Sequence, residues 1–141
     1  EELVTVAIIK AITDSPELTE KVNSIYGNVK LVVDKTIKLE IDSLIMLKTG
    51  DLIAFEAKTG FNTRLISSQK DLESRIKNIR DLTGAYTQWA LIFPYNQEEL
   101  KLLPNLKFKN KIEISWKSKD KKIIMMDEIA GYLHEIISDR D

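Results

Sequence analysis

Residues 40–60 read E-I-D-S-L-I-M-L-K-T-G-D-L-I-A-F-E-A-K-T-G. Two apolar runs, residues 41–47 and 52–57, flank the four-residue connection K-T-G-D at residues 48–51. Apolar and β-branched arms around a short connection that contains glycine are typical of a β-hairpin. We therefore expect two antiparallel strands that turn within this connection.

Three charged residues stand out against the apolar arms. Asp42 lies early in the first arm, and Glu56 and Lys58 lie at the end of the second. Because side chains alternate along a strand, Glu56 and Lys58 share one face of the sheet and Ala57 points away from it. In an antiparallel hairpin, Asp42 comes to lie close to opposite residues 56–57. The pattern predicts two carboxylates and one ammonium at one end of the hairpin.

Such a cluster suits a hard divalent cation. Mg²⁺ and Mn²⁺ prefer oxygen ligands and commonly bind one or two carboxylates together with water and a substrate phosphate. A lysine on the same face would position or deprotonate a metal-bound water, whose pKa the metal lowers. The alternative is an exposed hairpin whose charged ends form a Glu–Lys ion pair, because charged residues make up about a quarter of a typical chain.

The charged residues also carry a resemblance. Asp42 is separated from Glu56 by 13 residues, and this Asp-x13-Glu-x-Lys pattern resembles the signature of the PD-(D/E)XK nuclease superfamily. The E-I-D and E-A-K-T-G elements are most similar to the C-terminal nuclease domains of CRISPR-associated Rossmann-fold (CARF) effectors. The run L-E-S-R-I-K-N-I-R-D-L-T-G at residues 72–84 is similar to them as well. Ile41 stands where the superfamily usually has a proline.

The resemblance implies an α/β fold with a restriction-endonuclease-like α-β-β-β-α-β core, in which helices flank a mixed central sheet. It implies a metal-dependent endonuclease that hydrolyses phosphodiester bonds in DNA, RNA or both. Asp42, Glu56 and the Ala57 carbonyl would hold Mg²⁺ or Mn²⁺. Lys58 would position the attacking water and stabilise the transition state.

Two helices supply further candidates through the resemblance. An acidic residue of the first helix helps to ligate the metal in that family, and Glu1 or Glu2 matches its place. A Gln or Lys of the helix after the hairpin often faces the metal, and Gln69 or Lys70 matches it. The ordinary alternative for each is plain helix surface. Acidic residues in a first turn interact favourably with the helix N-terminus whatever their function.

A dense group of lysines surrounds residues 112–116, which alternate like a strand. The candidates for contacting a nucleic-acid backbone are Lys117, Lys119, Lys121 and Lys122. Lysines bind phosphates without reading sequence, so a phosphate-tracking surface is one interpretation. The alternative is an edge strand that its charges protect from aggregation.

Hydrophobic periodicity and turn residues predict the remaining elements. Helices are expected at residues 1–13, 17–25, 65–83, 97–103 and 126–137. Strands are expected at residues 29–33, 36–47, 52–57, 88–93 and 112–116. The apolar stripe of the first helix is expected to be Leu3, Val6 and Ile9, joined by Ile12 or Ala7.

Composition narrows the class of protein. The 141 residues suit a single domain over residues 1–141, and the absence of cysteine excludes disulfides and thiolate metal sites. The net charge of −1 means that nucleic-acid binding needs a local basic patch. No apolar run approaches transmembrane length, so we expect a cytoplasmic protein with no membrane partner. The missing initiator methionine suggests a processed chain or a domain excised from a longer one.

The resemblance to CARF-linked domains carries further implications. The intact protein would have an N-terminal cyclic-oligoadenylate sensor outside this chain and would act in CRISPR antiviral defence as a homodimer. A restriction-type endonuclease or junction resolvase would carry the same residues at its metal site. A third alternative is a non-catalytic nucleic-acid-binding domain with this fold. The intact Asp42, Glu56 and Lys58 argue against it, because an unused pair of buried carboxylates costs stability.

Overall fold

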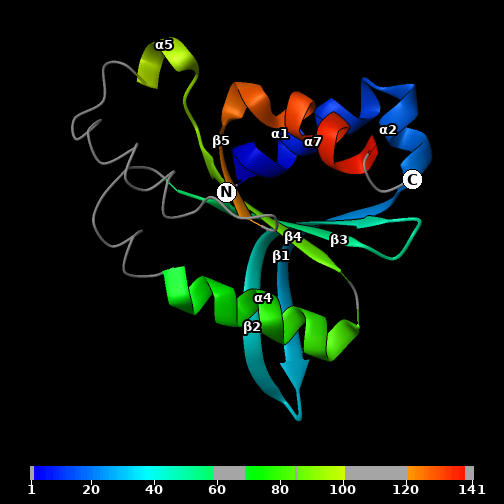
Figure 1. Cartoon of the computed structure of the whole chain (residues 1–141), viewed down its shortest axis with the longest axis vertical. Coiled ribbons are helices and arrows are strands. Elements are labelled where there is room, and N and C mark those ends of the chain that lie inside the picture. Colours follow the sequence, from blue (N-terminus) through cyan, green and yellow to red (C-terminus); the bar gives the residue numbers. More distant parts are fainter. Residues whose placement is uncertain (1, 59–68, 85, 101–120, 139–141) are drawn as a thin grey trace.

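A mixed five-stranded sheet forms the centre of the protein, in the order β1-β2-β3-β4-β5 (Figure 1). The computed structural model describes residues 2–58, 69–84, 86–100 and 121–138. The strands are β1 Val22–Val33, β2 Thr36–Leu47, β3 Leu52–Ala57, β4 Thr87–Phe93 and β5 Lys121–Met125. Strands β1 to β3 run antiparallel, whereas β4 is parallel to β3 and β5 is parallel to β4.

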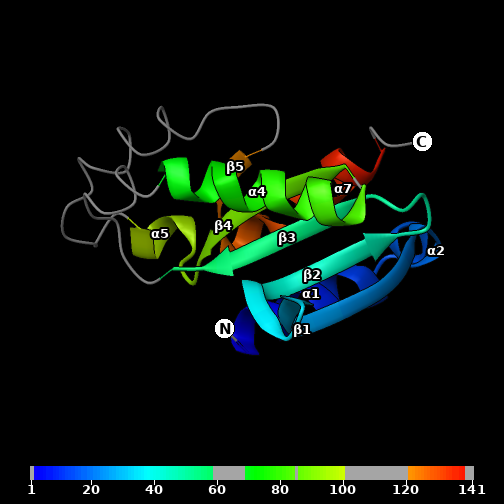
Figure 2. The ribbon, with the colours of Figure 1, turned by 90° about the horizontal axis from the view of Figure 1, so that it is seen from below.

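Helices cover both faces of this sheet. They are α1 Glu2–Thr13, α2 Pro16–Lys21, α4 Gln69–Thr83, α5 Gln97–Leu100, the 3₁₀ turn η1 Met126–Glu128 and α7 Ile129–Ser138. Helix α4 lies on one face, and α1, α2 and α7 lie on the other (Figures 1 and 2). The order of α1, the three antiparallel strands, α4 and β4 is the restriction-endonuclease-like α-β-β-β-α-β core. The predicted fold class is confirmed.

The central hairpin forms as its sequence predicts. The Leu47 N–H donates to the Asp51 carbonyl at 2.9 Å, and the Gly50 N–H donates to the Leu47 carbonyl at 2.9 Å. Gly50 has a φ of 93°, a left-handed conformation that favours glycine. This turn fixes the register of β2 against β3, in which Ser43 pairs with Phe55 and Met46 pairs with Leu52.

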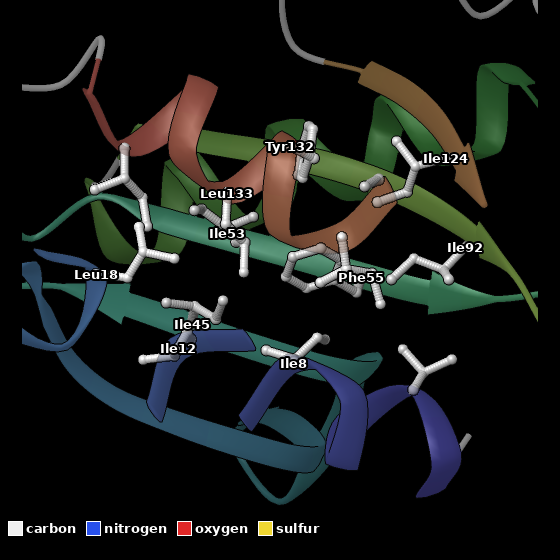
Figure 3. Packing of buried hydrophobic residues seen from close by; sticks show 14 of the residues in the cluster. Ile8, Ile12, Leu18, Ile45, Ile53, Phe55, Ile92, Ile124, Tyr132 and Leu133 are labelled. Atoms are coloured by element: carbon white, nitrogen blue, oxygen red, sulfur yellow. The ribbon is translucent and has the colours of Figure 1, made fainter. Parts of the chain in front are cut away.

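Apolar residues fill the space on each side of the sheet. On the α4 face, Ile76 and Ile79 pack in one cluster with residues such as Trp89 and Leu91. On the other face, α1, α2 and α7 close over the sheet (Figure 3); the residues labelled there are Ile8, Ile12, Leu18, Ile45, Ile53, Phe55, Ile92, Ile124, Tyr132 and Leu133. Strand β4 is buried along its whole length, as expected for a parallel strand covered on both faces.

The predicted apolar stripe of α1 is mostly wrong. The buried residues are Val4, Ile8 and Ile12, whereas Leu3, Val6 and Ile9 are exposed. Helix α1 is apolar around most of its circumference, so two different stripes satisfy the helical period. The stripe spaced by four residues is the one that packs on the sheet. Of the expected positions, Ile12 belongs to it and the half-buried Ala7 packs beside it.

The region between α1 and the hairpin also differs from expectation. Helix α2 begins where Ser15 accepts a hydrogen bond from the Leu18 N–H at 3.3 Å, as the predicted cap requires. The helix ends at Lys21 instead of residue 25. The expected turn at residues 26–28 lies inside β1, where Tyr26 and Gly27 pair with β2, and only Asn28 keeps a turn-like, left-handed φ of 51°.

Three differences concern the second half of the chain. Helix α4 begins at Gln69, and the four residues expected before it lie outside the described residues, as does the expected strand at residues 112–116. Strand β5 was not expected, because its two lysines look like part of a basic surface. The expected closing helix begins as the 3₁₀ turn η1 and continues as α7, with Ile129, Leu133 and Ile137 buried. No described helix combines the length and the apolar character that crossing a bilayer requires.

Tyr132 of α7 makes the stability of the fold sensitive to high pH. Its ring meets Phe55 edge-on with centroids 6.1 Å apart, and its buried hydroxyl has no hydrogen-bond partner among the described residues. Burial, together with the charge of Glu135, raises the pKa of the Tyr132 hydroxyl above its usual value. The unfolded chain loses this proton near pH 10 and the folded protein keeps it, so stability falls as the pH rises above about 10.

We expect Tyr132→Phe to leave the free energy of unfolding at pH 7 unchanged or to raise it by about 1 kcal/mol, because no hydrogen bond is lost. Above pH 10 the variant should lose stability less steeply than the parent, by up to about 1.4 kcal/mol per pH unit. Urea denaturation at pH 7 and pH 11 measures both effects. Tyr26→Phe, which alters an exposed tyrosine, should change neither the stability at pH 7 nor the loss of stability at pH 11. A loss above 1 kcal/mol at pH 7 would show that the hydroxyl has a partner.

Candidate active site at the end of strand β3

Asp42 lies where the β1–β2 ribbon leaves the rest of the sheet. The β2–β3 ladder covers residues 43–46 of β2, so Asp42 is the first residue beyond it. From there the ribbon of β1 and β2 runs on without β3 toward its tip (Figure 1). On β1, Asn28 lies opposite Asp42, between two regular pairs, and has a left-handed φ of 51°. Asparagine tolerates this conformation better than most residues, and it interrupts the ladder beside the candidate site.

A hydrogen bond ties the Asp42 carboxylate to β3. Its Oδ2 accepts from the Ala57 N–H at 2.9 Å. The N–H and carbonyl of one strand residue point toward the same neighbouring strand. The Ala57 carbonyl therefore also faces β2. The pairing of Ser43 with Phe55, continued by one residue, sets Asp42 opposite Glu56. The predicted position of Asp42 close to opposite residues 56–57 is confirmed.

Glu56 is flanked by two cations. Its Oε1 lies 3.2 Å from Lys58 Nζ and 3.9 Å from Arg75 Nη1 of α4. The Glu56 side chain is 20% exposed, and those of Lys58 and Arg75 are 37% and 38% exposed. Lys58 shares a face with Glu56, as the alternation of strand side chains predicts. Cationic partners lower the cost of placing a carboxylate where it is mostly withdrawn from water.

Two packing constraints hold these groups in place. The Lys58 N–H donates to the Ile92 carbonyl of β4 at 2.9 Å, which fixes the backbone just after β3. Helix α4 is anchored on the same face of the sheet by Ile76 and Ile79. Arg75 directly precedes Ile76, so the anchored helix brings its guanidinium to the end of β3.

Arg75 is a site residue that the sequence analysis missed. Its spacing from Asp71 is that of an exposed ion pair on a helix, which gave no reason to place it at the sheet. The one sequence feature that could have indicated its place is the position of Arg75 next to the apolar stripe of α4. A long side chain at the border of a buried stripe reaches over the neighbouring strand end.

The structure does not describe the side chains of several predicted site residues. Glu2 is in the first turn of α1, and Gln69 and Lys70 begin α4, but their side chains lie outside the described part of the chain. Glu1 lies outside the described residues, and so do Lys117 and Lys119. Their predicted roles stay predictions.

The two remaining lysines do not share a surface. Lys121 is buried, with 7% of its surface exposed, whereas Lys122 is exposed. They are neighbours on β5, and neighbouring strand residues point to opposite faces. Lys122 Nζ lies 3.5 Å from Glu135 Oε2 and 5.9 Å from the centre of the Tyr132 ring. Lys121 therefore does not belong to an exposed basic surface with Lys122.

The donor atoms at the end of β3 suit a hard divalent cation. Two carboxylates and the Ala57 carbonyl supply oxygen, the element that Mg²⁺ and Mn²⁺ prefer. Within the described ranges, no three His, Cys, Asp or Glu side chains come together as a metal-binding group. One or two carboxylates completed by water and phosphate are a common way to bind Mg²⁺. Asp42 and Glu56 fit this description.

No family model matches the chain, and no curated protein matches its sequence. Among solved structures, 13 chains match. One is the small subunit of the heterodimeric restriction endonuclease R.BspD6I, with a TM-score of 0.47, 9% identity, and coverage of 99% of this chain and 80% of that chain. Another is a repair endonuclease from Pyrococcus abyssi, with a TM-score of 0.34, 18% identity, and coverage of 70% of this chain and 41% of that chain. Both similarities are distant.

The hydrogen bond from Ala57 to Asp42 leads to a test of the site's geometry. Asp42→Ala removes the acceptor and should lower the free energy of unfolding by about 1–2 kcal/mol, measured by urea denaturation in EDTA. Asp42→Asn keeps an oxygen acceptor, so its free energy of unfolding should fall by less. Asp14→Ala, at an exposed position directly after α1, serves as a control. Equal stabilities for Asp42→Ala and the parent would contradict the geometry.

Proposed function

We propose that this domain is a divalent-metal-dependent nuclease that hydrolyses phosphodiester bonds in DNA, RNA or both. The observation that carries the proposal is the grouping of Asp42, Glu56 and Lys58 at one end of β3, with Lys58 Nζ 3.2 Å from Glu56 Oε1. The α-β-β-β-α-β core that presents these residues supports it, because the resembling superfamily uses this end of the hairpin for catalysis.

Each residue has a defined part in the proposed reaction. Asp42, Glu56 and the Ala57 carbonyl hold the cation, Mg²⁺ or Mn²⁺, which when bound acidifies water and offsets phosphate charge. Lys58 orients the attacking water and offers its ammonium to the charge that develops on the phosphate. The partial burial of Glu56 strengthens these interactions, because water screens them less.

Other predicted residues complete the proposal. Glu1 or Glu2 adds an acidic ligand from the start of α1, and Gln69 or Lys70 adds a polar contact from the start of α4. Lys122, with the sequence neighbours Lys117 and Lys119, contacts the nucleic-acid backbone. The buried Lys121 is not included.

A narrower assignment also remains a proposal. The motif resemblance favours the nuclease domain of a CARF-type CRISPR effector, which acts in the cytoplasm as a homodimer with a cyclic-oligoadenylate sensor in a preceding domain. A restriction-type endonuclease or a junction resolvase would use the same residues at the end of β3. A non-catalytic nucleic-acid-binding domain would have no use for two carboxylates, Asp42 and Glu56, at the same end of the hairpin.

The nuclease proposal predicts metal-dependent cleavage. Supercoiled plasmid, single-stranded DNA and single-stranded RNA are each incubated with the protein in Mn²⁺, Mg²⁺ or EDTA. We expect at least one substrate to be cut only with metal. Lys58→Ala and Glu56→Ala should each lower the rate on the order of 10²-fold or more, because each removes a group that acts in the transition state.

The matched control for Lys58→Ala is Lys48→Ala, an exposed lysine in the turn at the other end of the hairpin. It should cut at the parent's rate. Circular dichroism shows whether Lys58→Ala keeps the fold. A folded Lys58→Ala variant with undiminished cleavage would remove Lys58 from the site, and no cleavage of any substrate by the parent would count against a nuclease acting on its own.

Metal binding can be tested without any substrate. Mn²⁺ should raise the melting temperature of the parent, because a ligand that binds only the folded state adds about 2.7 kcal/mol at 100 times its dissociation constant. The increase should vanish in Glu56→Gln and persist in Glu20→Gln, which makes the same change at an exposed position of α2. The metal-site assignment fails if the parent shows no increase, or if Glu56→Gln keeps it.

A further inference from the structure

Arg75 stands beside a carboxylate that already has a cationic partner. Lys58 Nζ lies 3.2 Å from Glu56 Oε1, and Arg75 Nη1 lies 3.9 Å from the same oxygen. The distance to Arg75 exceeds hydrogen-bond length. The pair joins a guanidinium that is 38% exposed to a carboxylate that is 20% exposed, and a pair of this length and partial exposure stabilises a fold only modestly. The contact with Glu56 therefore contributes little to the stability of the fold.

With a metal bound, the charges of the group favour an anion. Asp42, Glu56, Lys58 and Arg75 together are neutral, so a divalent cation bound there would give the group two net positive charges. A phosphodiester carries one negative charge and would be attracted to this metal-loaded end of β3.

Arginine has the right chemistry for this anion. Its planar guanidinium presents several N–H donors in a fixed fork, which binds two phosphate oxygens at once, whereas lysine acts as a point charge. The packing of Ile76 and Ile79 anchors this part of α4 beside the site, and Arg75 Nη1 lies 3.9 Å from Glu56 Oε1. The Arg75 side chain is 38% exposed, so a ligand at the end of β3 reaches it from solvent.

We propose that Arg75 binds a phosphate of the nucleic-acid substrate at the end of β3, beside the group to be cleaved. The role rests on the proposed nuclease function and adds a phosphate-binding residue to that site. Lys58 compensates Glu56 and serves the reaction, and Arg75 positions the substrate backbone.

The test compares Arg75→Gln, Arg75→Lys and Lys77→Gln. Lys77 lies on the same helix, is exposed, and pairs with Asp81 at 2.8 Å, so Lys77→Gln makes the same change of charge away from the site. Three quantities are measured on the folded proteins. They are the Mn²⁺ affinity without nucleic acid, the affinity for a fluorescent single-stranded DNA or RNA in EDTA as a function of salt, and the rate of cleavage with Mn²⁺.

We expect Arg75→Gln to bind Mn²⁺ as tightly as the parent or more tightly, because a cation beside the metal ligand Glu56 has been removed. It should bind the oligonucleotide more weakly, with a salt slope reduced by about one contact. Its cleavage should fall on the order of 10-fold or more. Arg75→Lys should keep the salt slope and recover only part of the rate, because it lacks the fork. Lys77→Gln should match the parent throughout.

Two results would overturn the proposal. Cleavage and oligonucleotide binding equal to the parent's in Arg75→Gln would show that Arg75 does not contact the substrate. A loss of Mn²⁺ affinity in Arg75→Gln that matches its loss of cleavage would show that Arg75 only positions Glu56. Failure of the nuclease proposal itself gives a different result, because the parent would then neither bind Mn²⁺ nor cut nucleic acid. The proposed role of Arg75 would then be wrong as well.

Discussion

The antiparallel pairing of β2 with β3 is the constraint on which the site depends. The turn at Gly50 sets the register, and from Met46 to Ser43 each residue of β2 has a fixed partner on β3. The register then carries Asp42 to the end of β3, where its carboxylate accepts the Ala57 N–H. A slip by one residue would turn Glu56 and Lys58 to the opposite face of the sheet. The hydrogen bonds of the turn at Gly50 oppose such a slip, because they fix which residues of β2 and β3 lie opposite each other.

The second constraint is the parallel pairing of β3 with β4. A parallel pair requires a crossover, and α4 lies in the chain between the two strands. The α4 side chains that pack on β4 also place Arg75 at the end of β3. The fold thus brings one cation from the hairpin and one from the helix to the same carboxylate. Arg75 would not approach Glu56 without the packed core on the α4 face.

Local patterns in the sequence were enough to predict the hairpin and the approach of Asp42, Glu56 and Lys58, because alternation and a short turn determine them almost alone. Local patterns were not enough where a segment is compatible with two structures and only tertiary packing selects one of them. Helix α1 offers two apolar stripes, and only contact with the sheet selects Val4, Ile8 and Ile12. Strand β5 begins with two lysines, and only pairing with β4 makes it a strand. Arg75 depends on the docking of α4, which no local pattern contains.

In the proposed site, Asp42 and Glu56 together hold one divalent cation. A crystal structure with Mn²⁺, and an anomalous difference map at the manganese edge, would locate that cation. We expect a peak at ligand distance, about 2.1 Å, from both carboxylates, with Lys58 beside it. Manganese bound elsewhere, or no peak while Lys58 keeps its contact with Glu56, would contradict it.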